Sequence, residues 1–245
     1  MDPRIAIEVK NLGKVFGDIR ALDEFQLQIR TGEIYGLIGP NGAGKTTALR
    51  ILATLLLPTS GTATVFGLNV VDEAAEVRKH LTYLPEEAGA YKNLSGHEYL
   101  EFMTKFTIRN PAERKEVVEA AAKISGLGDR LRDKVKAYSK GMKRRLLVAR
   151  TLMTRPKLAI LDEPTSGLDV LHSVHVRGLI KEYVQRHGVT VLLSSHNMLE
   201  VEYLCDRVAL INQGRIVAEG SPSELKTRYN APNLEEAFAK VVSVA

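Results

Sequence analysis

The chain has 245 residues, of which 44% are hydrophobic and 26% are charged, and its formal net charge is +5. These values are close to the averages for soluble globular proteins, and they argue against a disordered or fibrous chain. The mild positive excess would suit a polyanionic ligand or an anionic membrane surface, but a solvated basic surface explains it equally well.

Cysteine content and hydropathy limit the setting in which the protein works. Cys205 is the single cysteine, so no internal disulfide can form, which fits a reducing cytosolic compartment without requiring it. The first residues, Met1-Asp2-Pro3, lack the charged-then-apolar order of a signal peptide. No run approaches the ~20 apolar residues of a membrane helix, so we expect any action at a membrane to go through a partner.

Predicted strands fall into two kinds along the chain. Ile5–Val9 and Phe25–Ile29 alternate apolar and polar side chains, which predicts half-buried antiparallel strands. Glu33–Ile38 and three later runs are almost wholly apolar, as in parallel strands that are buried on both faces. Helical stretches separate these runs and predict an α/β fold with a mostly parallel sheet and an N-terminal antiparallel β subdomain. The later runs are Leu158–Leu161, Val189–Leu193 and Val208–Ile211.

A glycine-rich loop follows the strand that is predicted to end at Ile38. It reads Gly39-Pro40-Asn41-Gly42-Ala43-Gly44-Lys45-Thr46-Thr47 and matches the phosphate-binding pattern G-x-x-x-x-G-K-[ST] in full. Its glycines allow backbone amides to surround an anion, and a helix that starts near Lys45 would point its positive end there. We expect Lys45 to contact the β- and γ-phosphates of a nucleotide and the Thr46 hydroxyl to hold Mg²⁺. A chance glycine-rich turn is the alternative, and it would occur in roughly 1% of chains.

The middle of the chain contains two consecutive helix starts. Ser95-Gly96-His97-Glu98 has the form of a capping box, and Asn110-Pro111-Ala112-Glu113 starts a second helix with Pro at its first position. Tyr99, Met103 and Phe106 mark one apolar face of the first helix. The pattern predicts an all-helical insert in the α/β domain, although ordinary crossover helices would also fit.

Polar side chains follow two of the predicted buried strands. Asp162-Glu163-Pro164 places two carboxylates at the carboxyl end of a strand, where open α/β folds bind ligands. Asp162 is the expected Mg²⁺ ligand, directly or through water, and Glu163 is then free to orient or deprotonate an attacking water. Solvated acids are the alternative, but the complete phosphate loop favours a catalytic pair. His196 follows the next strand end, Ser194-Ser195, and is expected to contact the γ-phosphate.

The order of these motifs resembles the ABC ATPases over nearly the whole chain. Tyr138-Ser139-Lys140-Gly141-Met142 stands where that family carries its signature sequence, usually Leu-Ser-Gly-Gly-Gln. Ser166-Gly167-Leu168-Asp169 resembles the D-loop of the family. The resemblance implies that Phe16 stacks on adenine and that His196 is the switch histidine.

Four positions depart from the usual pattern of the family. Glu86 stands where a Gln is usual; its carboxylate can still contact Mg²⁺ or its water, but it adds negative charge beside the phosphates. Lys140 and Met142 replace a glycine and a Gln of the signature, and Lys140 could add a cation near the γ-phosphate or point to solvent. Val170 replaces a common proline, and we expect little consequence.

The resemblance also implies how the protein assembles. Ser139 would cap a helix that runs through Arg150, and with Gly141 it would face the γ-phosphate held by a second ABC subunit. Two ATP molecules would join two chains, identical or different, and hydrolysis would let the dimer open. Integral membrane permease subunits are the expected partners, which would place the chain at the cytoplasmic face of the cell membrane. No nucleic-acid partner is expected.

The chain is predicted to be a single ABC ATPase domain over residues 1–245. Residues 1–86 and 139–220 would form the catalytic core with the β subdomain, and 87–138 the helical subdomain. Residues 221–245 would form a short helical tail that begins with a capping box at Ser221.

An ATPase that powers export is the leading functional interpretation, because the sequence around Glu86 and the short tail look most like ATPases of drug, lipid or ion exporters. A non-transport ABC protein acting on ribosomes or DNA is the alternative. The short insert without sustained heptads and the modest charge both disfavour it. A P-loop GTPase is disfavoured because no Asn-Lys-x-Asp motif is present.

Overall fold

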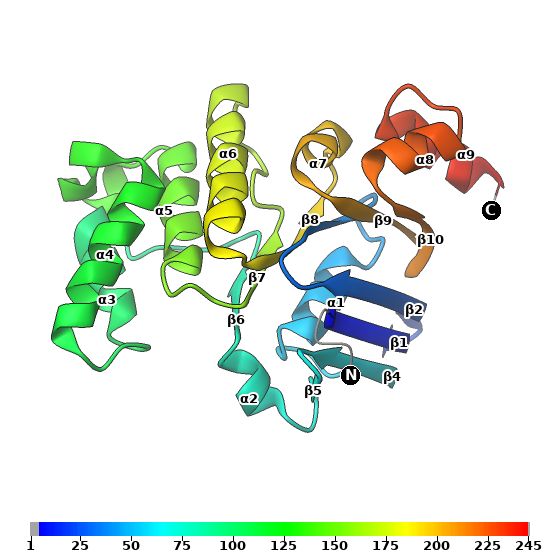
Figure 1. Cartoon of the computed structure of the whole chain (residues 1–245), viewed down its shortest axis with the longest axis horizontal. Helices are drawn as coiled ribbons and strands as arrows, with labels where there is room; N and C mark the ends of the chain where they lie inside the picture. Colours follow the sequence, from blue (N-terminus) through cyan, green and yellow to red (C-terminus); the bar gives the residue numbers. More distant parts are fainter. Residues whose placement is uncertain (1–4, 245) are drawn as a thin grey trace.

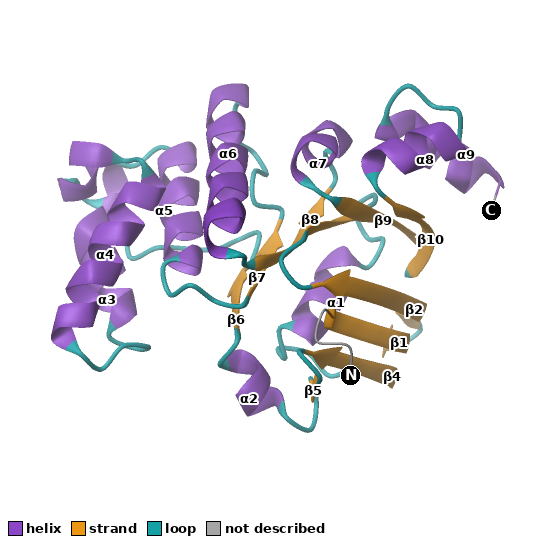
Figure 2. Cartoon of the chain, viewed as in Figure 1, coloured by secondary structure: helices purple, strands orange, loops and turns teal. Residues whose placement is uncertain are grey.

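The computed structural model describes residues 5–244, so the interpretation of Met1-Asp2-Pro3 lies outside the described range. The chain forms two sheets and a group of helices (Figure 1, Figure 2). In Figure 1 the helices α3 (Gly96–Thr104), α4 (Pro111–Ser125) and α5 (Lys140–Leu152) lie at one end of the molecule and the N-terminal sheet lies toward the other. The six-stranded sheet connects them, which confirms the predicted α/β fold.

The N-terminal sheet has the strand order β2-β1-β4-β5, and its neighbours are antiparallel, as predicted. β1 (Ile5–Phe16) and β2 (Ile19–Arg30) have 12 residues each and extend well beyond the predicted strands, because register shifts interrupt the alternation. β4 (Ser60–Val65) was not predicted, since its side chains are mostly small or polar, yet it pairs with β1 over much of its length. The short β5 (Leu68–Asn69) completes the sheet.

The second sheet has the order β10-β9-β3-β8-β7-β6, in which the pairs from β9 to β6 are parallel and β10 is antiparallel to β9. β3, β7 and β8 are buried along their whole length, as their apolar runs predicted. Their carboxyl ends share one edge of the sheet, because Ile38 pairs with Ser195 and Asp162 with Ser194. The strands are β3 (Ile34–Ile38), β6 (Leu81–Leu84), β7 (Leu158–Asp162), β8 (Thr190–Ser195), β9 (Arg207–Asn212) and β10 (Arg215–Gly220).

Two apolar cores hold these layers together. One core unites α1 (Lys45–Leu52) with side chains from both sheets, so this helix is fixed between them. The other core joins the opposite face of the parallel sheet to α5, to α6 (Val170–His187) and to α7 (Met198–Leu204). Because α1 directly follows the phosphate loop, this packing fixes the loop against the sheet edge.

The segment 87–138, all of it described, contains α3, α4, η1 (Gly128–Arg132) and η2 (Val135–Ala137). The predicted capping box at Ser95 and the predicted cap at Asn110 are both present. Phe106 is an error of the sequence analysis, which placed it on the apolar face of α3. The helix ends at Thr104, and the Phe106 ring is 68% exposed and packs edge-on against Phe102.

The remaining helices complete the chain. α2 (Ala74–Arg78) leads into β6, and α8 (Pro222–Arg228) begins with the predicted capping box at Ser221. α9 (Leu234–Val244) packs against α7 and α8. Among residues 5–244 no helix combines the length and the apolar character that a membrane crossing demands.

Candidate functional site

The phosphate loop (Gly39–Thr47) connects β3 to α1. Gly44 precedes the helix with φ of 106°, and a Cβ built there would lie 2.5 Å from the Ala21 carbonyl oxygen. A Cβ on Gly39 would collide with the Ile211 carbonyl, and Gly42 has φ of 80°. Gly44 therefore requires glycine both for backbone conformation and for space, Gly39 requires it for space, and Gly42 for backbone conformation. The predicted loop has the local geometry that a phosphate cradle needs.

Lys45 is the first residue of α1 and is only 6% exposed. Its Nζ donates to the Gly39 carbonyl at 2.8 Å and to the Pro40 carbonyl at 3.1 Å. The same ammonium lies 3.7 Å from Glu163 Oε1. A buried cation is thus held between the loop and a carboxylate that follows β7, two strands away in the sheet, where it can contact an anionic ligand of the loop.

Asp162 is a buried centre of hydroxyl contacts at the end of β7. Its Oδ1 accepts from Ser194 Oγ at 2.6 Å and from Thr46 Oγ1 at 3.2 Å, and its Oδ2 accepts from the Tyr83 hydroxyl at 3.2 Å. Burial and the neighbouring Asp162 charge raise the pKa of Tyr83 to about 12, so Tyr83 remains a donor. The motifs predict Thr46 and Asp162, but no motif in the sequence points to Ser194 and Tyr83 as their partners.

The oxygen donors of this edge suit Mg²⁺. The Thr46 hydroxyl and the Asp162 carboxylate converge, and Mg²⁺ typically takes one or two protein carboxylates together with oxygens of a phosphate substrate. Within residues 5–244 no group of three or more His, Cys, Asp or Glu side chains could hold a metal by itself. The Glu86 carboxylate accepts a hydrogen bond from Ser166 Oγ at 3.1 Å, so it contacts the D-loop (Ser166–Asp169). Its assignment to the metal stays a prediction.

Glu163 is buried next to Asp162 and has a left-handed backbone, with φ of 48°. Such a conformation is uncommon for a residue with a side chain and often occurs at functional sites. Glu163 Oε2 lies 2.9 Å from His196 Nδ1, and the Glu163 amide donates to Ser194 Oγ at 3.0 Å. The carboxylate therefore sits between the Lys45 ammonium and the half-exposed His196 imidazole. The structure thus brings together the predicted residues Lys45, Glu163 and His196.

Arg144 is a buried residue of α5 that the sequence analysis did not identify. Its guanidinium donates to the carbonyls of five residues, at distances from 2.6 to 3.2 Å. Burial lowers the pKa of Arg144, but carboxylates around it, including those of Asp162 and Glu86, oppose that shift. The available signal was an arginine at a helix position that 3.6-residue periodicity assigns to the buried face. The acceptors are Pro85, Glu86, Asp162, Glu163 and Pro164.

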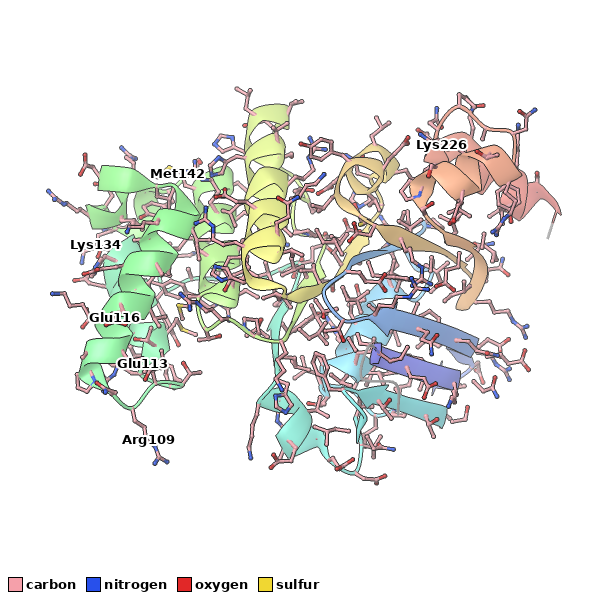
Figure 3. The ribbon with its side chains drawn as sticks, in the orientation of Figure 1. Arg109, Glu113, Glu116, Lys134, Met142 and Lys226 are labelled. Atoms are coloured by element: carbon pink, nitrogen blue, oxygen red, sulfur yellow. The ribbon has the colours of Figure 1, made fainter. Side chains whose placement is uncertain are left out.

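The signature segment (Tyr138–Met142) begins α5, and Ser139 caps this helix by accepting from the Met142 amide at 3.1 Å. In Figure 1 α5 and α1 lie on opposite sides of β7, and Figure 3 places Met142 among the helices at that end of the molecule. Ser139 and Gly141 are therefore not brought to the phosphate loop of their own chain.

The signature segment and the D-loop interlock within the chain. A Cβ on Gly141 would lie 2.5 Å from Cδ2 of the His172 ring, and a Cβ on Gly167 would collide with the Lys140 ammonium. Gly141 of the signature segment therefore receives the ring of His172, which lies in α6 three residues after the D-loop, and Gly167 of the D-loop receives the Lys140 side chain. His172 also donates its amide to Asp169 Oδ1 at 2.9 Å, and its Nδ1 lies 2.7 Å from Asp169 Oδ2. Hydrogen bonds from the His172 amide and ring lower the pKa of Asp169.

Phe16 ends β1 on the N-terminal sheet, and 46% of its surface is exposed. The Lys14 ammonium lies 4.8 Å from the centre of its ring, which is a cation–π distance. The exposed part of Phe16 leaves room for a planar ligand to contact the ring. Its assignment to adenine stays a prediction.

Comparison with known proteins agrees with this geometry. The family model described as ABC transporter matches residues 22–166. The chain is 40% identical over 225 residues to the daunorubicin/doxorubicin resistance ATP-binding protein DrrA of Streptomyces peucetius, which covers 92% of this chain and 68% of that protein. It also resembles the solved ATP-binding subunit of an ABC transporter, with a TM-score of 0.85, 27% identity, and coverage of 97% of this chain and 99% of that chain.

A further solved structure adds information on assembly. It is a dimeric, post-hydrolysis state of the ATP-binding cassette MJ0796 bound to ADP and Pi. Its TM-score is 0.78 and its identity to this chain is 25%, over 88% of this chain and 98% of that one. The similarity therefore includes a cassette that was captured after hydrolysis and as a dimer.

Proposed function

The chain belongs to the ABC transporter family as an ATP-binding and ATP-hydrolysing subunit, and from that premise we propose that it powers export through a separate membrane permease. The observation that carries the catalytic part is the buried group in which Lys45, Asp162 and Glu163 meet beside the phosphate loop. The similarity to a drug-resistance ATP-binding protein favours export over import.

We assign the binding of ATP to three parts of the chain. The amides of the phosphate loop and the Lys45 ammonium hold the β- and γ-phosphates, and the Phe16 ring stacks on adenine. Thr46 and Asp162 hold Mg²⁺, with Glu86 near it or its water. Mg²⁺ held there would supply positive charge against the negative charge that develops on the phosphates during transfer.

Hydrolysis requires a group that orients the attacking water and accepts its proton. Glu163 fills this role, because its carboxylate is buried at the strand edge and its Oε2 is already engaged with His196 at 2.9 Å. His196 keeps the carboxylate in place and contacts the γ-phosphate with the rest of its ring. Lys45 stabilises negative charge on the transferred group.

Two copies, or this chain and a related one, close around two ATP molecules. Ser139 and Gly141 lie at the start of α5, whose amides and dipole suit a phosphate, yet the helix lies away from its own phosphate loop. A second chain would supply the missing phosphate. The dimeric state of the similar cassette MJ0796 supports this arrangement.

The proposed helical subdomain, residues 87–138, offers the surface for the permease. Tyr91, Phe102 and Phe106 form a row of rings with centroids 5.3 and 5.1 Å apart, and the outer two are largely exposed. Exposed apolar groups of this kind mark protein interfaces. The row follows the Glu86 loop in sequence. That loop is bonded to Arg144 through the Glu86 carbonyl and to Ser166 through the Glu86 carboxylate, so a permease segment bound here would act near a loop that contacts the catalytic edge.

Purification of a tagged chain from its native membranes in mild detergent tests the transport assignment. We expect a multi-span membrane protein in stoichiometric amount, and Phe106→Ser should reduce its yield while ATP binding persists. Recovery of ribosomes, nucleic acid or soluble proteins alone would refute transport and favour the non-transport alternative, whereas the ATPase assignment would stand.

A further inference from the structure

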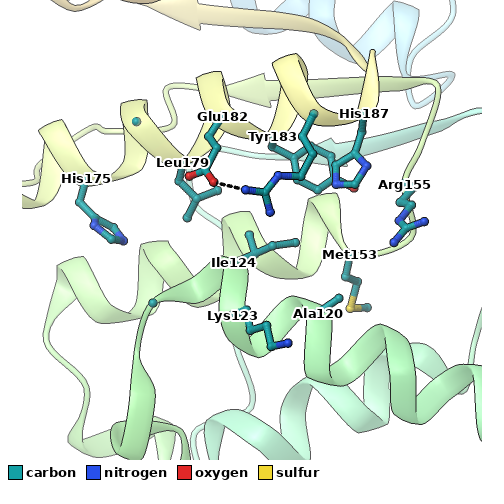
Figure 4. A pocket seen from close by; sticks show the side chains of 13 residues that line it. Ala120, Lys123, Ile124, Met153, Arg155, His175, Leu179, Glu182, Tyr183 and His187 are labelled. Carbon is teal, nitrogen blue, oxygen red and sulfur yellow. Dashed lines mark hydrogen bonds and ion pairs between the residues drawn. The ribbon is translucent and has the colours of Figure 1, made fainter.

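A groove with a volume of about 700 Å³ lies between α4 and α6, away from the nucleotide site (Figure 4). Its apolar lining includes Ile124, Met153 and Leu179. Arg155, which also lines it, stands just before β7, whereas Asp162 stands at the other end of that strand. Seven residue-to-residue steps of mostly extended chain lead from one to the other, a span of roughly 23 Å. The groove is therefore distinct from the catalytic edge.

Gly178 keeps the groove open. It lies in the middle of α6, where glycine weakens a helix relative to alanine. A Cβ built on Gly178 would meet no atom within 4 Å, so close packing does not require glycine at this position. A side chain longer than alanine would occupy the groove. Glycine at position 178 thus lowers the stability of α6 but leaves the groove free for a ligand.

Cations surround the apolar lining. Lys123, Arg155 and Arg186 line the groove, and among its lining residues Glu182 is the one carboxylate, which pairs with Arg186 at 2.5 Å. The groove thus carries an excess of positive charge. Burial lowers the pKa of His187, and the charges of Arg155 and Arg186 lower it further, which reflects the same positive potential.

Arg155 combines this charge with an unusual backbone. Its φ is 49°, a left-handed conformation that bulky residues rarely adopt and that persists where the surroundings impose it. A neighbouring cavity lies where the chain enters β7 and β8, and its lining includes Arg155, Lys157 and Arg186. The cationic side of the groove therefore continues beyond it.

We propose that this groove is a second ligand site, which binds a small amphipathic anion: an apolar group that carries a sulfonate, carboxylate or phosphate. Its volume matches that of sites for drug-sized ligands, which are mostly apolar with a few placed polar groups. The apolar lining receives the body of the ligand, and Lys123, Arg155 and Arg186 receive its charge. Because α4 and α6 form the two walls, a ligand there contacts both the helical segment and the core, and so influences their relative position.

A pair of dyes tests the charge requirement. The anionic 8-anilinonaphthalene-1-sulfonate and the neutral N-phenyl-1-naphthylamine share their rings, and only the first carries a sulfonate. Fluorescence titration of the full chain with saturating ATP and Mg²⁺ should give one site for the sulfonate, with affinity about tenfold or more above that of the neutral dye. Equal affinities would refute the anionic specificity, and a signal that is seen without ATP but not with saturating ATP would place the dye in the nucleotide site and overturn the proposal.

Two matched pairs of variants locate the site. Gly178→Leu should weaken sulfonate binding about tenfold or more, whereas Gly178→Ala should change it about twofold or less, and both should retain or raise the melting temperature. Arg155→Asn removes a cation but tolerates the left-handed backbone, so it should weaken binding, whereas Lys105→Gln, which removes an exposed cation at the end of α3, should not. Unchanged affinity in Gly178→Leu with a normal melting temperature would overturn the assignment.

Discussion

Replacement of Arg144 by lysine tests how helix α5 holds the loops that carry Glu86, Asp162 and Glu163. Arginine presents a planar set of donors in fixed geometry, and here they bond two carbonyls of one loop and three of another. Lysine keeps the charge, but its three donors share one nitrogen at a single point and cannot serve all five carbonyls of the two loops. Arg144→Lys should therefore release at least one loop from α5.

The magnitude follows from the lost hydrogen bonds. A bond from a charged donor contributes ~1.5–3 kcal/mol, so the loss of two or more bonds at this buried site should lower the free energy of unfolding by about 3–5 kcal/mol. For a chain of this size each kcal/mol corresponds to roughly 2–4 °C in melting temperature, which predicts a fall of roughly 6–20 °C. Displacement of the Asp162 and Glu163 backbone should also lower kcat, by a factor on the order of 100.

The assay combines thermal unfolding, ATP turnover and nucleotide affinity, with Arg145→Lys as the matched control. Arg145 is the next residue of α5, but it bonds the carbonyls of Ser125 and Gly126 at the end of α4. Arg145→Lys should lower the melting temperature moderately and leave kcat near wild type. If Arg144→Lys kept both the wild-type melting temperature and the wild-type kcat, the claim that Arg144 organises these loops would be wrong.

Four further substitutions examine the site. Glu163→Gln should bind ATP and dimerise but hardly hydrolyse it; turnover near the wild-type rate would exclude Glu163 as the base. Lys45→Ala should lose ATP affinity in equilibrium titration because it removes the buried ammonium of the phosphate loop, and unchanged affinity would contradict that assignment. Lys140→Gly should bind ATP as tightly as wild type, because the Lys140 ammonium lies over Gly167 of the same chain and not at the phosphate loop. A large loss of ATP affinity would contradict this prediction. Gly167→Ala should slow ATP turnover at unchanged ATP affinity, because the Gly167 φ is +65° and a Cβ there would meet the Lys140 side chain. In the Lys140→Gly background the same substitution should slow turnover less. An equal loss of turnover in both backgrounds would argue against the contact between Gly167 and Lys140.

The fold was predictable where local pattern is decisive. Buried parallel strands are apolar throughout, and helix starts carry capping residues, so β7 and the caps at Ser95 and Ser221 were recognised. β4 was missed because its stability comes from pairing with β1 rather than from its own small side chains. Phe106 was misplaced because the periodicity continued past the residue at which α3 ends.

The site was predictable at the level of sheet edges but not of individual contacts. Asp162 could be assigned to the carboxyl edge from its place after an apolar run. Its hydroxyl partner Tyr83 lies 79 residues earlier, and Glu86 bonds Ser166, 80 residues later. Such pairs depend on strand order and on how loops cross the edge, which a single sequence does not specify.

Helix α5 carries residues for two different tasks, contact with the nucleotide of a second chain and support of the catalytic Glu163. Its first turn, with Ser139 and Gly141, is the part assigned to a second chain's nucleotide, while Arg144 in the next turn fixes the backbone of Glu163. A helix is stiff over such a short distance, so engagement of its N-terminus and alignment of the catalytic carboxylate should be coupled. Amide hydrogen exchange tests this coupling: Glu163 and its neighbours should become more protected when the Glu163→Gln dimer closes on ATP, and Arg144→Lys should abolish that gain in the same background. A gain that survives Arg144→Lys would mean that the two tasks are independent.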